Sequence, residues 1–157
     1  VWKGEFLPKI KERINELGLA KQIDMPGFVE GDLFDVIAAL DIFVLMAPGS
    51  EGSCRAVLEA MAMSIPCVVT DRHGLSEIVE DGITASVVPW GDHRKLALSF
   101  LKLLEDKTRR TRFGRAGRRR VEQFYYRARR AEQVEKAYAR ILGLPVPEGD
   151  SGGEEIV

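Results

Sequence analysis

The 157-residue sequence predicts an α/β fold of the doubly wound type, with helices on both faces of a parallel sheet. Two short runs, at residues 42–46 and 66–70, are apolar and largely β-branched without polar alternation, as in strands that are buried on both faces. A helical segment that contains Glu59 lies between them. Because strand and helix alternate along the chain, a layered α/β architecture is favoured over an all-helical one.

The first third of the chain begins with a helix signal. Residues 6–17 place apolar side chains at the spacing of an amphipathic helix, and Gly18 suits its C-terminal stop. A short apolar stretch at 23–28 predicts a strand, and Asp32 can cap the helix that follows. The face of that helix expected to be buried comprises Leu33, Val36, Ile37 and Leu40.

The second half continues the alternation. A strand is predicted at 85–88, followed by a helix that Asp92 caps. The face of this helix expected to be buried comprises Leu96, Ala97, Phe100, Leu101 and Leu104. Two further helices are predicted at 107–124 and 126–142.

The composition of the chain limits the classes of protein to which it can belong. Residues 1–142 are expected to form the folded domain, and residues 143–157, rich in Gly, Pro and acids, a disordered tail. No apolar run approaches the roughly 18 residues of a membrane span, and no signal-peptide pattern is present, so a cytoplasmic location is the default expectation. Cys54 and Cys67, with only two histidines, match no metal-ligand spacing, which favours two reduced thiols over a disulfide or a metal site.

Two glutamates flank the predicted start of the central helix. Glu51 follows a Pro-Gly-Ser stretch that excludes helix, whereas Glu59 lies in an apolar helical run. Ligands of doubly wound sheets bind where strands lead into helices, and a helix starting near Ser53 would offer unpaired N–H groups to an anion. Carboxylates accept hydrogen bonds from neighbouring hydroxyls. A sugar held by Glu51 and a ribose held by Glu59, with phosphates between them, would make a nucleotide-sugar.

Other interpretations of this pair stay open. Either glutamate alone is better explained as a solvated charge. A glycosidase pair is disfavoured, because eight helical residues span about 12 Å, whereas such carboxylates lie about 5 to 9.5 Å apart. The small residues Gly49, Ser50, Gly52 and Ser53 allow a ligand to approach the backbone closely, which makes the combination more specific than its parts.

A series of short motifs occurs in a specific order over roughly residues 4–142. They are Gly27-Phe28-Val29, the run 38–44, Ser50-Glu51-Gly52, Leu58-Glu59-Ala60-Met61-Ala62, the run 66–71, the run 76–82 and Val88-Pro89. Together they resemble the C-terminal, donor-binding domain of a GT-B glycosyltransferase of family 4, which has a Rossmann-like sheet.

The resemblance implies a hexosyltransferase that retains anomeric configuration, needs no metal or other cofactor, and uses a UDP- or GDP-linked sugar as co-substrate. The acceptor would belong to glycan, lipid or polysaccharide synthesis. By this resemblance, Glu51 is the catalytic residue and contacts the donor sugar, while Glu59 contacts the ribose. The remaining donor-binding positions are the backbone at Gly52, Ser53, Cys54 and Arg55, beside the sugar and phosphates, and Gly27, Phe28 and Val29, beside the base.

The sequence also departs from the family pattern. Family members hold the diphosphate with an Arg and a Lys on a first strand-helix unit, and carry an N-terminal acceptor domain; neither matches a segment here. We therefore expect a sheet without its first strands, weak donor binding and no transfer by this chain alone. In addition, Ser64 stands where glycine is frequent. Two alternatives remain: a non-catalytic nucleotide-binding or protein-interaction module of the same fold and, more weakly, a sugar-nucleotide epimerase.

Basic residues gather in the last third of the chain. Between Lys107 and Arg130 there are eleven Lys or Arg residues and one acid. The arginines expected to form a surface are Arg109, Arg110, Arg112, Arg115, Arg118, Arg119 and Arg120. Such a helix attracts anionic lipid headgroups, so peripheral binding at the inner membrane face is one expectation. The other is a solvated face of a helix that packs through Phe113, Val121 and Phe124. The net charge of −1 and the absence of a recognition motif argue against nucleic acid.

Overall fold

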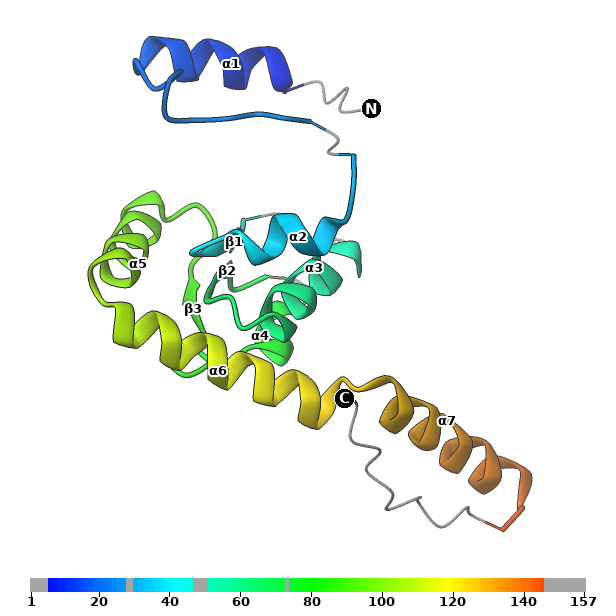
Figure 1. The fold of residues 1–157 in the computed structure, drawn as a ribbon. Helices are drawn as coiled ribbons and strands as arrows, with labels where there is room; N and C mark the ends of the chain where they lie inside the picture. Colours follow the sequence, from blue (N-terminus) through cyan, green and yellow to red (C-terminus); the bar gives the residue numbers. More distant parts are fainter. Residues whose placement is uncertain (1–5, 28–29, 47–50, 73, 146–157) are drawn as a thin grey trace. The chain divides into compact units, whose positions relative to one another are not determined.

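The computed structural model describes residues 6–27, 30–46, 51–72 and 74–145, and for residues 51–53 and 127–128 it describes the backbone only (Figure 1). The chain divides into two compact units, residues 1–36 and 37–157, and each is described by itself. The predicted tail therefore lies almost entirely outside the described residues, and its disorder stays a prediction. None of the described helices combines the length and the apolar character needed to cross a membrane.

The first unit opens with helix α1, Leu7–Glu16. Its end is the predicted glycine stop: Gly18 has φ 67°, and its N–H donates to the Asn15 carbonyl at 3.0 Å. The N–H of Leu19 donates to the Ile14 carbonyl, also at 3.0 Å. These two bonds satisfy carbonyls that the helix itself leaves unpaired.

The strand predicted at 23–28 is wrong over its described residues, since positions 23–27 form no strand. Pro26 has no N–H to donate to a strand ladder. Gly27 has φ 73°, which turns the chain out of the extended conformation. The apolar character of the stretch was therefore outweighed by its Pro-Gly turn.

Helix α2, Leu33–Ala38, confirms the predicted cap, because Asp32 Oδ1 accepts a hydrogen bond from the Phe34 N–H at 2.8 Å. The predicted face is mostly wrong. Only Ile37 is buried, while Leu33, Val36 and Leu40 are between 37% and 58% exposed. A helix of six residues has fewer than two turns, so few of its positions can face a core.

The second unit is built on a three-stranded parallel sheet in the order β1-β2-β3. The strands are β1 (Phe43–Leu45), β2 (Cys67–Thr70) and β3 (Ala85–Val88). Every residue of the central strand β2 is buried, as predicted from its unbroken apolar run. β1 is half-buried, consistent with its place at an edge of the sheet in the described part of the chain.

Helices cover both faces of this sheet (Figure 1). The remaining helices are α3 (Glu51–Ala62), α4 (Leu75–Ile78), α5 (His93–Glu105), α6 (Lys107–Phe124) and α7 (Arg127–Leu142). Cys67 and Val69 of β2 face a core formed with α3 and α4, whereas Val68 faces a second core with Leu103 of α5 and Phe113 of α6. This arrangement, a sheet between two layers of helices, confirms the predicted Rossmann-like α/β fold.

The buried face of α5 differs from the predicted one. Leu103 is buried, while Leu101 and Leu104 are 50% and 55% exposed. Ala97 is exposed too, and only Leu96 and Phe100 are half-buried. In this orientation Leu103 packs against Val88 and Phe113, and the Ser86 hydroxyl on β3 donates to the Ser99 hydroxyl at 3.0 Å. Because the segment is rich in leucine on several faces, its periodicity could not select the right one.

Candidate functional site

The carboxyl ends of the three parallel strands meet at one edge of the sheet, where each strand leads toward a helix (Figure 1). The loops after β2 and β3 are joined there. The N–H of Asp71 donates to the Val88 carbonyl at 3.1 Å, and Asp71 Oδ1 accepts from the Trp90 N–H at 3.0 Å. This edge is therefore a fixed platform on its β2 and β3 side, and it is the edge at which doubly wound sheets bind ligands.

Helix α3 starts at this edge, and it starts earlier than predicted. The structure places Glu51, Gly52 and Ser53 in its first turn, so the expectation that Glu51 precedes the helix is wrong. The Pro-Gly pair only prevents helix before this point, while an acidic residue is favourable in a first turn because of the helix dipole. The side chains of these three residues lie outside the description, and their roles stay predictions.

Two predicted site residues of α3 are brought together. Arg55 Nε donates to Glu59 Oε1 at 2.8 Å, with the Arg55 side chain 80% exposed and the Glu59 side chain 18% exposed. Glu59 is thus neither a freely solvated charge nor a core residue. A carboxylate has about four acceptor sites, so Arg55 leaves capacity for the hydroxyls of a ligand.

Cys54 is half-buried beside the turn that enters α4. A Cβ placed on Gly74, the N-cap of α4, would lie 4.0 Å from Cys54 Sγ. Gly74 itself has φ 75°, which favours glycine at this turn. The described residues Asp71, Arg72 and Gly74 therefore border the site, and Arg72 is exposed. The sequence allows His73, in the loop from Asp71 to Gly74, as a contact for a phosphate or the acceptor, beside the alternative of a merely exposed residue, and this residue lies outside the described ones.

A cavity of about 500 Å³ adjoins the same edge, between the loop after β2, α4, β3 and the first turn of α5. Its polar lining includes Asp71, Ser76, Asp81 and Lys95. Asp81 accepts from the Val87 N–H at 2.8 Å, as Asp71 does from Trp90. Both carboxylates thus accept hydrogen bonds from backbone N–H groups. Among the residues that line the cavity, Lys95 is the one with a cationic side chain.

Gly27 lies in the first unit and lines a depression of about 430 Å³ there, with Leu7 and Lys11 of α1 among its neighbours. Phe28 and Val29, the other two residues predicted to lie against a base, fall outside the described residues. The structure therefore describes one of these three positions.

Burial raises the pKa of Cys67 to about 12, because charge on a thiolate would be desolvated inside the core. This thiol belongs to the sheet interior and not to the candidate site. In the described ranges, no group of three or more His, Cys, Asp and Glu side chains gathers as metal ligands would.

Comparison with known proteins agrees with this architecture. Residues 3–120 match the family model for glycosyl transferases group 1. Alpha-maltose-1-phosphate synthase from Mycobacterium tuberculosis is 34% identical over 118 residues, which cover 71% of this chain and 30% of that enzyme. The chain therefore spans less than a third of the length of this relative.

Two solved structures share the fold. HepE from Anabaena, crystallised in complex with UDP, matches with a TM-score of 0.81 and 21% identity over 87% of this chain and 37% of that chain. The C-terminal domain of a glycosyl transferase group 1 family protein, LpcC from Francisella tularensis, matches with a TM-score of 0.69 and 25% identity over 78% of this chain and 64% of that chain. With the family model matched over residues 3–120, the chain belongs to the group 1 glycosyl transferases.

Proposed function

We propose that this chain forms the donor-binding part of a retaining, metal-independent glycosyltransferase of family 4, which transfers a hexose from a UDP- or GDP-linked donor. Membership of the group 1 family supports sugar transfer, and the fold shared with HepE, solved with UDP, supports a nucleotide in the donor. The acceptor would belong to glycan, lipid or polysaccharide synthesis. Since the chain spans 30% of its relative, acceptor binding is assigned to other residues of the whole protein, and the chain alone is not expected to transfer sugar.

The observation that carries the proposal is the Arg55–Glu59 pair on α3, the helix that starts at the carboxyl edge of the sheet. A carboxylate that is 18% exposed and already held by an arginine has lost much of its rotamer freedom before a ligand arrives. This preorganisation suits a residue that accepts hydrogen bonds from two adjacent ribose hydroxyls. Glu59 is assigned that role.

The other roles follow the family resemblance. Glu51 is assigned to the donor sugar as the catalytic residue, and the first turn of α3, from Gly52 to Arg55, to the sugar and phosphates. The first N–H groups of α3, at Glu51, Gly52 and Ser53, have no acceptor four residues earlier within the helix, and the dipole favours an anion there. Gly27, Phe28 and Val29 are assigned to the base.

Isothermal titration calorimetry of UDP-glucose, GDP-mannose, UDP and GDP into the chain tests the proposal. We expect one nucleotide series to bind, and Glu59→Gln to weaken it by roughly 10- to 100-fold, the value of hydrogen bonds to a charged group. Glu122→Gln is the matched control, because Glu122 accepts from Arg118 Nε at 2.8 Å in the same i, i+4 arrangement on another helix. It should leave the affinity unchanged.

The same titrations separate the alternative, a non-catalytic module. Such a module would bind UDP and UDP-glucose equally, and Glu51→Gln would change neither affinity. A transferase donor site loses affinity for the nucleotide-sugar, but not for the free nucleotide, when Glu51 is changed. Failure of every nucleotide to bind the folded chain would contradict a donor site and a nucleotide-binding module alike, and would leave a protein-interaction module of the same fold.

A further inference from the structure

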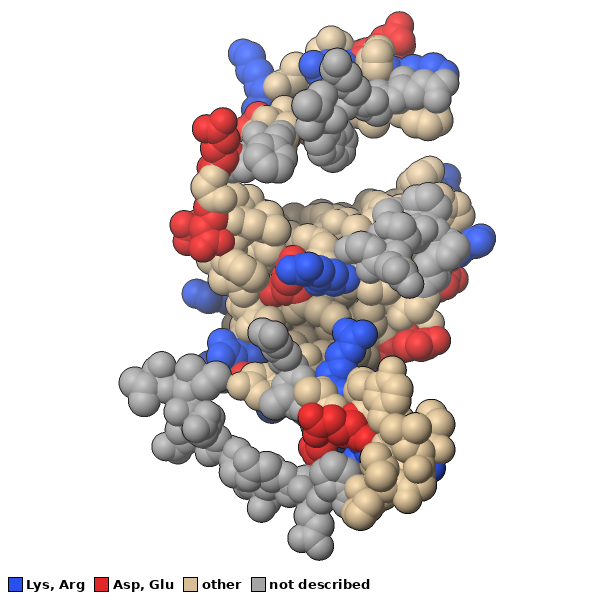
Figure 2. Space-filling model, turned by 90° about the vertical axis from the view of Figure 1, so that its right-hand side faces the viewer, with Lys and Arg blue, Asp and Glu red and all other residues tan. Residues whose placement is uncertain are grey.

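The charges on the surface of this protein do not form one large region of a single sign. On the face drawn in Figure 2, Lys and Arg side chains alternate with Asp and Glu side chains in small groups, separated by other residues. With a net charge of −1, any attraction to an anionic partner must therefore come from a local surface.

The arginines of α6 divide into two groups. Arg110 Nη1 donates to the carbonyls of Leu103 and Leu104 at 2.6 and 2.7 Å, so it caps the end of α5. Arg120 is bound to α4, and Arg118 is paired with Glu122. These three are thus engaged within the fold, and Arg109 lies over the Phe113 ring, with 5.3 Å between its Cζ and the ring centroid. The predicted surface of seven arginines is therefore reduced to Arg112, Arg115 and Arg119.

The second group lies along one stripe of α6. Lys107, Arg112, Arg115 and Arg119 line a shallow depression of about 570 Å³ together with two threonines, and no carboxylate lines it. In the part of the chain that the structure describes, Lys107, Arg115 and Arg119 form no ion pair. Their charges are therefore available to a partner.

The stripe ends at exposed apolar side chains. Arg119 also lines a smaller depression of about 180 Å³, to which Ile83, Phe124 and the ion pair of Glu80 with Arg120 contribute. Ile83 is 55% exposed and Phe124 is 48% exposed. Cations and protruding apolar side chains are thus continuous on one surface.

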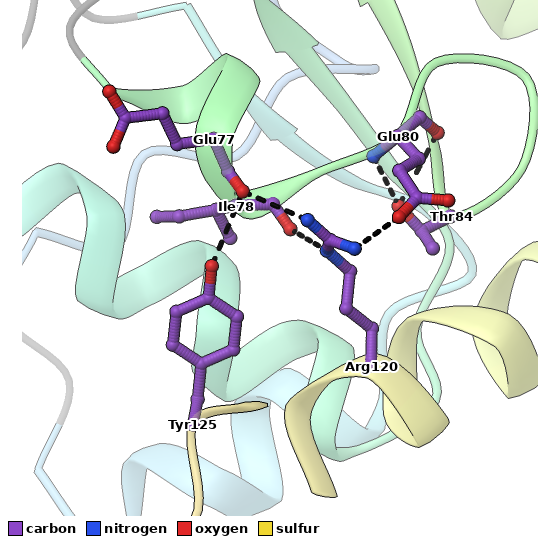
Figure 3. Close-up of polar contacts among 6 residues, drawn as sticks. All are labelled: Glu77, Ile78, Glu80, Thr84, Arg120 and Tyr125. Atoms are coloured by element: carbon purple, nitrogen blue, oxygen red, sulfur yellow. Dashed lines mark hydrogen bonds and ion pairs between the residues drawn. The ribbon is translucent and has the colours of Figure 1, made fainter. Parts of the chain in front are cut away.

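The turn that presents Ile83 is rigidly fixed beside α6 (Figure 3). The N–H of Ile83 donates to the Glu80 carbonyl at 3.1 Å, and Thr84 Oγ1 accepts from the Glu80 N–H at 2.8 Å. Arg120 of α6 donates to the Glu80 carboxylate and, at 2.6 Å, to the Ile78 carbonyl. The exposure of Ile83 is therefore a property of the folded state.

We propose that Lys107, Arg112, Arg115, Arg119, Ile83 and Phe124, called here the α6 surface, dock on an anionic membrane surface. The cations match phospholipid headgroups, and the apolar tips match the boundary between headgroups and acyl chains. A polyanion such as RNA would use the cations but offers no apolar layer to Ile83. The inference is independent of the donor site, since no residue of the α6 surface belongs to α3 or to the loop from Asp71 to Gly74.

Vesicle sedimentation of the 157-residue chain tests the proposal, with phosphatidylcholine vesicles that contain either no or about one third phosphatidylserine. We expect binding only to the anionic vesicles, weakened by added salt. Arg115→Gln and Arg119→Gln should each reduce the partition coefficient about fivefold. Arg118→Gln removes one charge from the same helix, but at a position that does not line the depression, and should reduce it less than about twofold.

A second pair of variants tests the apolar contribution. Ile83→Ser should reduce partitioning at least as much as one arginine change, whereas Leu98→Ser should not, although Leu98 on α5 is 54% exposed and Ile83 is 55% exposed. Absence of binding to anionic vesicles, or equal losses for Arg118→Gln and Arg115→Gln, would overturn the proposal. So would an unchanged Ile83→Ser combined with tight binding of a single-stranded RNA probe, which would identify a polyanion site instead.

Discussion

The guanidinium of Arg120 lies against the last turn of α4, where its Nε donates to the Ile78 carbonyl at 2.6 Å and its Nη2 to the Glu77 carbonyl at 3.0 Å (Figure 3). Tyr125 Oη also donates to the Glu77 carbonyl, at 3.3 Å. A helix of four residues cannot satisfy its own final carbonyls. The end of α6 therefore completes α4, and with it the loop that borders the candidate site.

We expect Arg120→Gln to lower the free energy of unfolding by about 2 to 3 kcal/mol, because it removes the arginine donor from the Ile78 carbonyl and the Glu80 carboxylate and leaves the Glu77 carbonyl with Tyr125 alone. The Arg120 side chain is only 19% exposed. Arg118→Gln should lower it by less than about 0.5 kcal/mol, since both members of the Arg118–Glu122 pair are more than half exposed. Urea denaturation followed by circular dichroism measures both values. Equal effects would show that Arg120 acts only as a surface charge.

The two buried threonines are expected to respond in opposite directions. Among the described residues, Thr70 Oγ1 is buried without a hydrogen-bond partner, whereas Thr84 Oγ1 accepts from the Glu80 N–H at 2.8 Å. Thr70→Val should therefore keep or raise the free energy of unfolding, by up to about 1 kcal/mol, and Thr84→Val should lower it by about 1 to 3 kcal/mol. A marked loss in Thr70→Val would mean that its hydroxyl has a partner, such as an ordered water.

Two glycines of α6 mark its close approach to α3 and the turn after it. A Cβ on Gly114 would lie 2.0 Å from the Ser64 carbonyl oxygen, a backbone atom that cannot move aside. A Cβ on Gly117 would lie 3.3 Å from Met61 Cγ, in a flexible side chain. We expect Gly114→Ala to lower the free energy of unfolding by more than about 2 kcal/mol.

Gly117→Ala is the control for this packing. It should stay within about 1 kcal/mol of the parent, because alanine's higher helix propensity offsets the small shift of Met61. Thermal unfolding of both variants decides the matter. If Gly114→Ala were as stable as Gly117→Ala, the helices would be free to separate.

Sequence patterns predicted this fold where burial and periodicity agree. β3 and α6 have the predicted bounds, and β2 differs by one residue. For β2 the prediction is close because an unbroken apolar run is stable as a strand only where both of its faces are buried. The departure noted at Ser64 also has a structural reason: its φ of 62° is a conformation that glycine adopts more easily.

The predictions that failed share one cause, which is contact between residues far apart in the sequence. The face that α5 buries packs against β3 and α6, with Leu103 against Phe113 and Ser99 bonded to Ser86, which is 13 residues away. Likewise α4, a single turn, shows no periodicity and is completed by Arg120 from a distant helix. At the candidate site, the residue types of Arg55 and Glu59 were predicted to matter, but their pairing could be seen only in the structure.

The two cysteines should differ in reactivity, since Cys67 is fully buried on β2 and Cys54 is half-buried on α3. Burial raises the pKa of Cys67 from 9.0 to about 12, so its thiolate is scarce at neutral pH and its sulfur is out of reach of a reagent. We expect a thiol reagent such as N-ethylmaleimide to label Cys54 in the folded chain, and Cys67 only after unfolding, as read by mass spectrometry of the peptides.

The raised pKa of Cys67 also makes the stability depend on pH. Because the folded state holds the Cys67 proton more tightly, the contribution of this proton to the free energy of unfolding is complete below about pH 9 and is lost as the pH rises toward 12. Between these values, the stability of the parent should fall more steeply with pH than that of Cys67→Ala. Equal slopes, or equal labelling of the two thiols, would show that the sheet interior opens to solvent.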